Sequence, residues 1–222
     1  MNELVPAFET SLFETSISEI GIEFAELGID SILQDGLLKD IPIVGTIVNV
    51  GKFAQNIYDR NLLRQTLSFI KEFNSCTISS AKIDKYRNKL KKNPKLMEAE
   101  LGRVLILLNK NIDTIKSIFE ARFYAAYIDN SISWDEFCEL CDITDRLFIS
   151  DISNLKEAYV NKGVTNEMTI TYKYDRLISV GLLTNEARLS GGIMMFEIDS
   201  KTPQIIIKFT NIGNMFCDIV FK

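Results

Sequence analysis

Apolar residues recur at steps of three and four along much of this chain, the spacing that places side chains on one face of an α-helix. The longest series lies in residues 96–127 and comprises Leu101, Leu105, Leu108, Ile112, Ile115 and Phe119. A second series lies in residues 7–34 and comprises Phe13, Ile17, Ile20, Phe24 and Leu27. The sequence therefore predicts a mainly α-helical protein, with one helix over each of these ranges.

Residues 36–57 contain a stretch that would form a helix apolar on most sides, and they allow two interpretations. Pro42 suits the first turn of a helix, where its missing N–H costs no hydrogen bond. The spacing then continues and predicts a single helix from Pro42 towards Phe73. We favour a central helix that its neighbours cover. The alternative is a segment that leaves the core to meet a membrane or a partner through Ile43, Val44, Ile47 and Val48.

Shorter signals predict where other helices begin and end. Residues 81–92 indicate a short basic helix, which Asn93-Pro94 ends. Ser133 and Glu136 have the spacing of a capping box, in which each residue satisfies the other's backbone N–H. We expect a helix to begin at that box, and a further short helix to begin at Asp151 or Ser153.

The C-terminal part carries a pattern of helix, hairpin and closing helix. A helix over residues 170–180 is followed by apolar stretches at Gly192–Ile198 and Gln204–Phe209, and then by a short helix over Asn211–Phe221. This order resembles a winged-helix module, and the resemblance covers residues 133–222. We therefore expect a multi-helix region over residues 1–130, and a winged-helix-like region with one β-hairpin over residues 131–222. In DNA-binding members of that family the helix before the hairpin enters the major groove, whereas other members dock proteins.

Charge is strongly segregated along the chain, although the net charge is only −5. Residues 1–60 hold ten acids and three bases, whereas residues 61–130 hold thirteen bases and seven acids. We favour attraction between these parts of one fold over attraction to a partner. The alternative is a contact with nucleic acid or another anion, for which the candidate residues are Lys85, Arg87, Lys89, Lys92, Lys173 and Arg176.

The residues that most enzymes need are poorly represented. The chain has no histidine, which removes the commonest general base and metal ligand. Cys138 and Cys141 have the spacing of half a zinc site, but a structural zinc needs four ligands and no second pair exists. We therefore expect no enzymatic activity, no cofactor, no bound metal and no small-molecule substrate.

Two segments resemble a group of small, uncharacterised bacterial proteins that accompany mobile elements and phage-defence loci. These segments are residues 37–48, Leu-Leu-Lys-Asp-Ile-Pro-Ile-Val-Gly-Thr-Ile-Val, and residues 132–137, Ile-Ser-Trp-Asp-Glu-Phe. The resemblance implies a bacterial cytoplasmic protein with an accessory role in defence. Four sparse cysteines and the lack of a signal-peptide pattern agree with a reducing cytoplasm.

Three functions are compatible with the sequence. The first is a non-enzymatic interaction or regulatory protein that docks a protein partner, or a second copy of itself, through the winged-helix-like region. The second is a DNA-binding transcriptional regulator that uses residues 170–180 and the basic helix. The third is a membrane-acting effector that uses residues 36–57.

Overall fold

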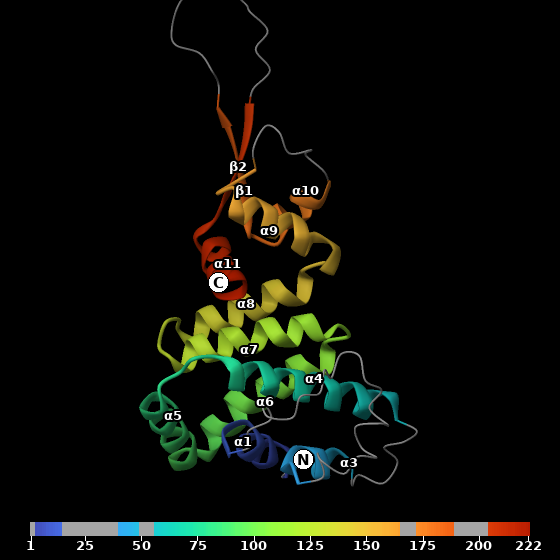
Figure 1. Cartoon of the computed structure of the whole chain (residues 1–222), viewed down its shortest axis with the longest axis vertical. Helices are drawn as coiled ribbons and strands as arrows, with labels where there is room; N and C mark the ends of the chain where they lie inside the picture. The colour runs from blue at the N-terminus through green and yellow to red at the C-terminus, as the bar shows by residue number, and fades with distance from the viewer. Residues whose placement is uncertain (1–2, 15–39, 49–55, 165–171, 189–203) are drawn as a thin grey trace, which may run out of the picture. The chain divides into compact units, whose positions relative to one another are not determined.

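The structure, a computed structural model of the whole chain, describes residues 3–14, 40–48, 56–164, 172–188 and 204–222. Within these residues the protein has ten α-helices, one 3-10 helix and one two-stranded antiparallel sheet (Figure 1). The mainly helical fold expected from the sequence is confirmed. The chain divides into two compact units, Met1–Cys141 and Asp142–Lys222, which we call unit 1 and unit 2. The division falls inside a helix, beyond the boundary expected near Asn130.

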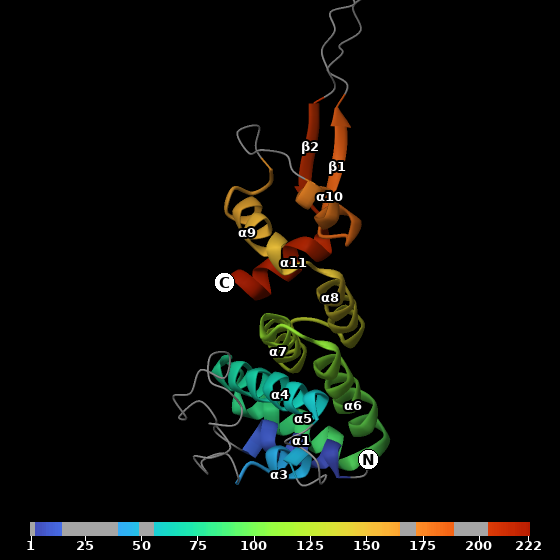
Figure 2. The ribbon, with the colours of Figure 1, turned by 90° about the vertical axis from the view of Figure 1, so that its right-hand side faces the viewer.

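Unit 1 is a bundle of helices around an aromatic core. Its helices are α1 (Leu4–Glu14), α3 (Pro42–Val48), α4 (Ile57–Ser75), α5 (Ser80–Lys92), α6 (Pro94–Lys110), α7 (Thr114–Ile128) and the first part of α8 (Trp134–Arg146). Helix α4 packs against both α6 and α7, and α1 packs against α3 and α6 (Figures 1 and 2). In the core, the Phe69 ring centroid lies 6.0 Å from that of Phe8 and 5.9 Å from that of Tyr124.

The continuous helix predicted from Pro42 to Phe73 is wrong, because the backbone is extended at Asn56 and a new helix begins there. Asn56 Oδ1 accepts a hydrogen bond from the Tyr58 backbone N–H at 3.0 Å, which caps α4. The start at Pro42 is confirmed. Helix α1 provides the first part of the helix predicted over residues 7–34. The rest of that series, from Ile17 to Leu27, lies outside the described residues.

The single helix predicted over residues 96–127 is also wrong. It is two helices, α6 and α7, separated at Asn111, where the backbone is extended. The buried Asn111 side chain donates to Ser117 Oγ at 3.0 Å and to Glu120 Oε2 at 2.8 Å. Helix α4 satisfies the carbonyls of the turn, because Asn61 donates to Asn111 O and Gln65 donates to Ile112 O. These tertiary hydrogen bonds stabilise a break within an unbroken apolar series.

Other local signals gave correct boundaries. Helix α5 ends at Lys92, and Asn93 then caps α6, whose first residue is Pro94. The capping box is present, since Ser133 N donates to Glu136 Oε2 at 2.7 Å and Glu136 N donates to Ser133 Oγ at 3.2 Å. These bonds explain why α8 begins at Trp134.

Unit 2 contains a β-hairpin between short helices. After the last turn of α8 come the 3-10 helix η3 (Ile149–Asp151), α9 (Ile152–Val160), α10 (Tyr172–Ser179), β1 (Leu183–Arg188), β2 (Gln204–Phe209) and α11 (Asn211–Phe221). The two strands are antiparallel, with Leu183 opposite Phe209 and Arg188 opposite Gln204. Helix α9 packs against α10 and α11.

The hairpin and the closing helix were predicted, but the first strand was placed wrongly. The partner of β2 is Leu183–Arg188, directly after α10, whereas the expected strand at Gly192–Ile198 lies outside the described residues. Helix α11 has the predicted bounds. Its start lies close to the turn after α10, because a Cβ on Gly213 would be 1.9 Å from Leu182 O. Thr210 caps α11 by accepting from Gly213 N and donates to Gly181 O at 2.6 Å.

Candidate functional site

The basic helix α5 is tied to the acidic N-terminus through Arg87. The Arg87 guanidinium pairs with Glu9, at 3.0 Å, and with Glu14, both on α1. Its Cζ also lies 5.6 Å from the centroid of the Phe13 ring. These contacts agree with the attraction between oppositely charged parts that we favoured from the sequence. Arg87 is therefore engaged inside unit 1, whereas Lys85 and Lys92 are exposed on the same helix.

Lys89, on α5, lies beside a buried carboxylate. Its Nζ is 3.5 Å from Oε1 of Glu100, a residue of α6 that is only 4% exposed. The same carboxylate accepts hydrogen bonds from two phenols, Tyr86 and Tyr127, the latter at 3.1 Å. The Tyr124 hydroxyl is 2.7 Å from that of Tyr86. We call these residues the Glu100 cluster: Tyr86, Lys89, Glu100, Tyr124 and Tyr127.

The electrostatics of the Glu100 cluster keep its phenols protonated. Burial raises the pKa of Tyr86 and of Tyr124 far above the usual value, and the charge of Glu100 acts in the same direction. Burial and Glu100 also raise the pKa of Tyr127. The phenols can therefore act only as hydrogen-bond donors or acceptors near neutral pH. Glu100 accepts hydrogen bonds from two of them, and these bonds compensate for burying its carboxyl group.

Arg176 lies beside a second buried carboxylate, in unit 2. The carboxylate is that of Asp151, which is 1% exposed. Arg176 Nε donates to Asp151 Oδ2 at 2.9 Å and Nη2 donates to Oδ1, so that the pair is bidentate. Such pairing fixes both the position and the plane of a guanidinium. Asp151 stands before α9, where the sequence predicted a helix start, but its side chain makes no capping hydrogen bond and serves Arg176 instead.

Two exposed aromatic rings enclose the same guanidinium. Arg176 Cζ is 4.2 Å from the centroid of the Phe148 ring and 4.8 Å from that of Tyr172. Phe148 is 54% exposed and Tyr172 is 65% exposed. We call this arrangement of Phe148, Tyr172 and Arg176 over Asp151 the Arg176 stack. Lys173, the other cation predicted on this helix, donates to the backbone oxygen of Ser150 at 2.9 Å.

The segment with two interpretations is buried where the structure describes it. Ile43, Val44 and Ile47 are at most 3% exposed, and Val48 is half-buried. The Ile43 backbone N–H donates to Ser11 Oγ at 2.9 Å, which joins α3 to α1. Among the helices in the described part of the chain, none has both the length and the apolar content to cross a bilayer. The arrangement is that of a core helix, and a membrane role stays a prediction.

The cysteine pair does not assemble a metal site in the described residues. Cys141 is fully buried in α8, Cys138 is half-buried one turn earlier, and neither forms a disulfide. The described ranges contain no cluster of three or more cysteine, aspartate or glutamate side chains suited to a metal ion. The structure therefore brings no third ligand to this pair within those ranges.

The sequence identified the two cations Lys89 and Arg176 but missed the residues that hold them. Tyr172 and Arg176 are four apart on one helix, a spacing that predicts a contact between them. Phe148 and Asp151 are distant in sequence from Arg176, and no local signal joins them. The same is true of Glu100 and its tyrosines. No protein-family model, curated protein or solved structure matches this chain.

Proposed function

We propose that the chain is a non-enzymatic interaction protein that docks a protein partner through unit 2, and that unit 2 is a winged-helix-like module. The order of α10, the hairpin of β1 and β2, and α11 supports the second part of this proposal. The close approach of Gly213 to Leu182 supports it further, because it holds the closing helix against the start of the hairpin.

The observation that carries the docking function is the Arg176 stack. Tyrosine and arginine are enriched among the residues that dominate the energy of protein interfaces, and phenylalanine is enriched at interface cores. Asp151 neutralises the guanidinium, which lowers the cost of removing it from water. The bidentate pair and the two rings also fix the geometry before binding, so that little conformational entropy is lost when a partner docks.

The same contacts make DNA recognition by α10 the weaker alternative. A DNA-reading arginine needs its guanidinium fork free for a base edge. Arg176 directs two of its nitrogens to Asp151, and Lys173 is bonded to Ser150 O. Lys85 and Lys92 on α5 are exposed and can attract phosphates, but without sequence specificity.

The test is co-purification from the native host of tagged, full-length protein. We expect a stoichiometric protein partner with the wild type and its loss in the double variant Phe148→Ala, Tyr172→Ala. Val160→Ala is the matched control, because Val160 is 70% exposed in the same unit but lies outside the stack. Retention of the partner by the double variant, or its loss after nuclease treatment, would contradict the proposal.

We place this function in the bacterial cytoplasm, as an accessory of a defence locus. The resemblance of residues 37–48 and 132–137 supports this setting, as does the reduced state of the four cysteines, which form no disulfide. Gene neighbours of the chain test it directly. A locus that lacks defence or mobile-element genes in several genomes would remove the support for the setting and leave the docking proposal unchanged.

A further inference from the structure

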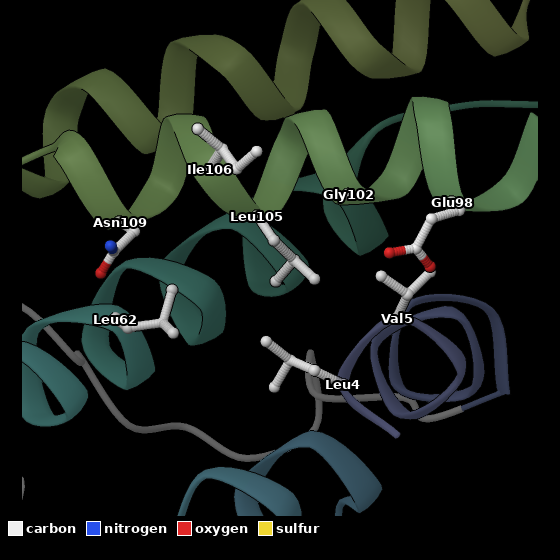
Figure 3. A pocket seen from close by; sticks show the side chains of 8 residues that line it. All are labelled: Leu4, Val5, Leu62, Glu98, Gly102, Leu105, Ile106 and Asn109. Carbon is white, nitrogen blue, oxygen red and sulfur yellow. The ribbon is translucent and has the colours of Figure 1, made fainter. Parts of the chain in front are cut away.

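Unit 1 contains an apolar pocket at the junction of α1, α4 and α6. Its volume is about 210 Å³. Figure 3 shows Leu4, Leu62 and Leu105 pointing towards its centre, one from each of the three helices. Glu98 and Asn109, both on α6, lie at opposite ends of the pocket. The lining is thus aliphatic in the middle and polar at the two ends.

One exposed apolar side chain, Ile106, lines the pocket. Among the described residues of unit 1, the strongly exposed large apolar side chains are Ile57, Tyr58, Ile106 and Ile112. Ile106 is 61% exposed and itself lines the pocket. Tyr58 precedes Leu62 by one helical turn, on the same face of α4. The bond from Asn61 to Asn111 O holds the start of α4 beside the end of α6. An exposed apolar side chain that continues an apolar pocket is a feature of interaction surfaces.

The pocket is the right size for a single bulky side chain. A dry cavity of about 150 Å³ lined by aliphatic groups accepts a benzene molecule. A pocket of about 210 Å³ therefore has room for the side chain of leucine, methionine or phenylalanine. A helix that lays such an anchor into a groove between helices is a common mode of peptide recognition.

The charges at the two ends select the direction of that helix. Glu98 carries a negative charge at one end, and the exposed Lys110 follows Asn109 at the other. Helices favour acidic residues in their first turn and basic residues in their last turn. A helix whose first turn lies near Lys110 and whose last turn lies near Glu98 satisfies both preferences. Such a helix runs antiparallel to α6.

We propose that this pocket docks an amphipathic helix of a protein partner, antiparallel to α6, with one bulky apolar anchor between Leu4, Leu62 and Leu105. Acidic residues before the anchor face Lys110, and basic residues after it face Glu98. The site belongs to unit 1, and the inference does not rest on the function proposed for unit 2.

The probe is a displayed library of random 16-residue peptides, selected against the immobilised full-length chain. We expect enriched peptides with one bulky apolar anchor, acidic residues before it and basic residues after it. Binding of an enriched peptide, measured by fluorescence anisotropy, should weaken at least tenfold in Ile106→Glu. It should change less than threefold in Ile112→Glu, because Ile112 is 78% exposed and does not line the pocket. An equal loss of peptide affinity in both variants, or enriched peptides whose affinity does not change in Ile106→Glu, would overturn the proposal.

A charge exchange tests the direction. In the double variant Glu98→Lys, Lys110→Glu, the same library should yield peptides with the opposite order of charges. An unchanged order would refute the antiparallel arrangement. Sedimentation of the wild type and of Ile106→Glu tests a second copy as the occupant. A wild-type dimer that Ile106→Glu dissociates would assign the pocket to that copy and overturn the proposal of a separate partner.

Discussion

Two buried carboxylates, one in each unit, have opposite surroundings. Glu100 in unit 1 is 4% exposed, and it accepts from the half-buried Tyr127 and from the buried Tyr86, whose hydroxyl also contacts that of the fully buried Tyr124. Asp151 in unit 2 is 1% exposed, but its donor Arg176 reaches the surface between two exposed rings. Each carboxylate also has a nearby cation that the sequence presents as a candidate for binding phosphate.

The comparison shows that a buried charge can serve the core or the surface. Around Glu100 the side-chain hydrogen bonds join three helices of unit 1, α5, α6 and α7. Around Asp151 the hydrogen bonds hold Arg176, whose guanidinium contacts the exposed rings of Phe148 and Tyr172. Removing Glu100 takes the carboxylate acceptor away from the buried Tyr86 hydroxyl, and a lost charge-assisted hydrogen bond in the interior destabilises the fold. Removing the charge of Asp151 leaves an arginine that water can reach. The two sites should therefore differ in how much stability each provides.

The largest effect is expected for Glu100→Leu. This change leaves the Tyr86 hydroxyl buried without its carboxylate, and it should lower the free energy of unfolding by about 2–4 kcal/mol. Glu98→Leu is the control, because Glu98 is exposed on the same helix. Urea unfolding followed by far-ultraviolet circular dichroism measures both. A Glu100→Leu variant as stable as the control would show that the cluster does not stabilise the core.

The second prediction concerns alkaline pH. The pKa values of Tyr86 and Tyr124 in the folded protein are raised above the ordinary value of 10.0. As pH rises, the unfolded chain therefore loses these protons at a lower pH than the folded protein does. The stability they contribute is complete below pH 10 and falls above it, by about 1.4 kcal/mol per pH unit for each phenol. Urea midpoints between pH 9 and pH 11 measure the slope, which should be shallower in Tyr124→Phe.

The control for the alkaline experiment is Tyr58→Phe, which removes a phenol that is 75% exposed. Its slope should match that of the wild type. A wild-type midpoint that stays constant up to pH 11 would mean that the phenols ionise as easily in the folded protein as in the unfolded chain. The buried network around Glu100 would then be open to water.

The third prediction addresses Asp151 and should be smaller. Asp151→Asn keeps the shape and one acceptor but removes the charge-assisted bond, and it should cost about 1 kcal/mol. Asp175→Asn is the control, because Asp175 is exposed on α10. The variant should also bind the partner of unit 2 more weakly, because Arg176 loses its fixed plane. A loss of stability equal to that of Glu100→Leu would remove the distinction between the two sites.

The sequence predicted those parts of the fold that depend on neighbouring residues. The capping box at Ser133 and the bounds of α11 each rest on bonds within a few residues. The break at Asn111 was missed because its apolar series continues while Asn61 and Gln65, far away in the chain, satisfy its carbonyls. The first strand was missed because Leu183–Arg188 contains few apolar residues, and its pairing with β2 defines it.

The candidate sites follow the same rule. Lys89 and Arg176 were identified as cations, and only the fold shows that each lies beside a buried carboxylate. Glu100 and Asp151 have apolar sequence neighbours such as Leu101 and Ile152, but acidic residues are mostly exposed, so the sequence did not predict that either would be buried. Tyr172 and Arg176 are the exception, because their spacing on one helix brings them together without help from the rest of unit 2.

The smallest effects are expected for DNA binding. This measurement distinguishes exposed lysines from an arginine that is already paired with a carboxylate. We expect weak, sequence-independent binding that depends on the exposed Lys85 and Lys92 rather than on Arg176. In gel shifts over a range of salt, Lys85→Ala with Lys92→Ala should reduce the slope of log affinity against log salt by about 1.8, since each phosphate contact contributes about 0.9. Arg176→Ala should change affinity less than twofold, because its guanidinium is already paired with Asp151. Tight, sequence-dependent binding that Arg176→Ala abolishes would mean that the stack opens to read DNA, and the contrast between the two carboxylates would then describe only the unbound protein.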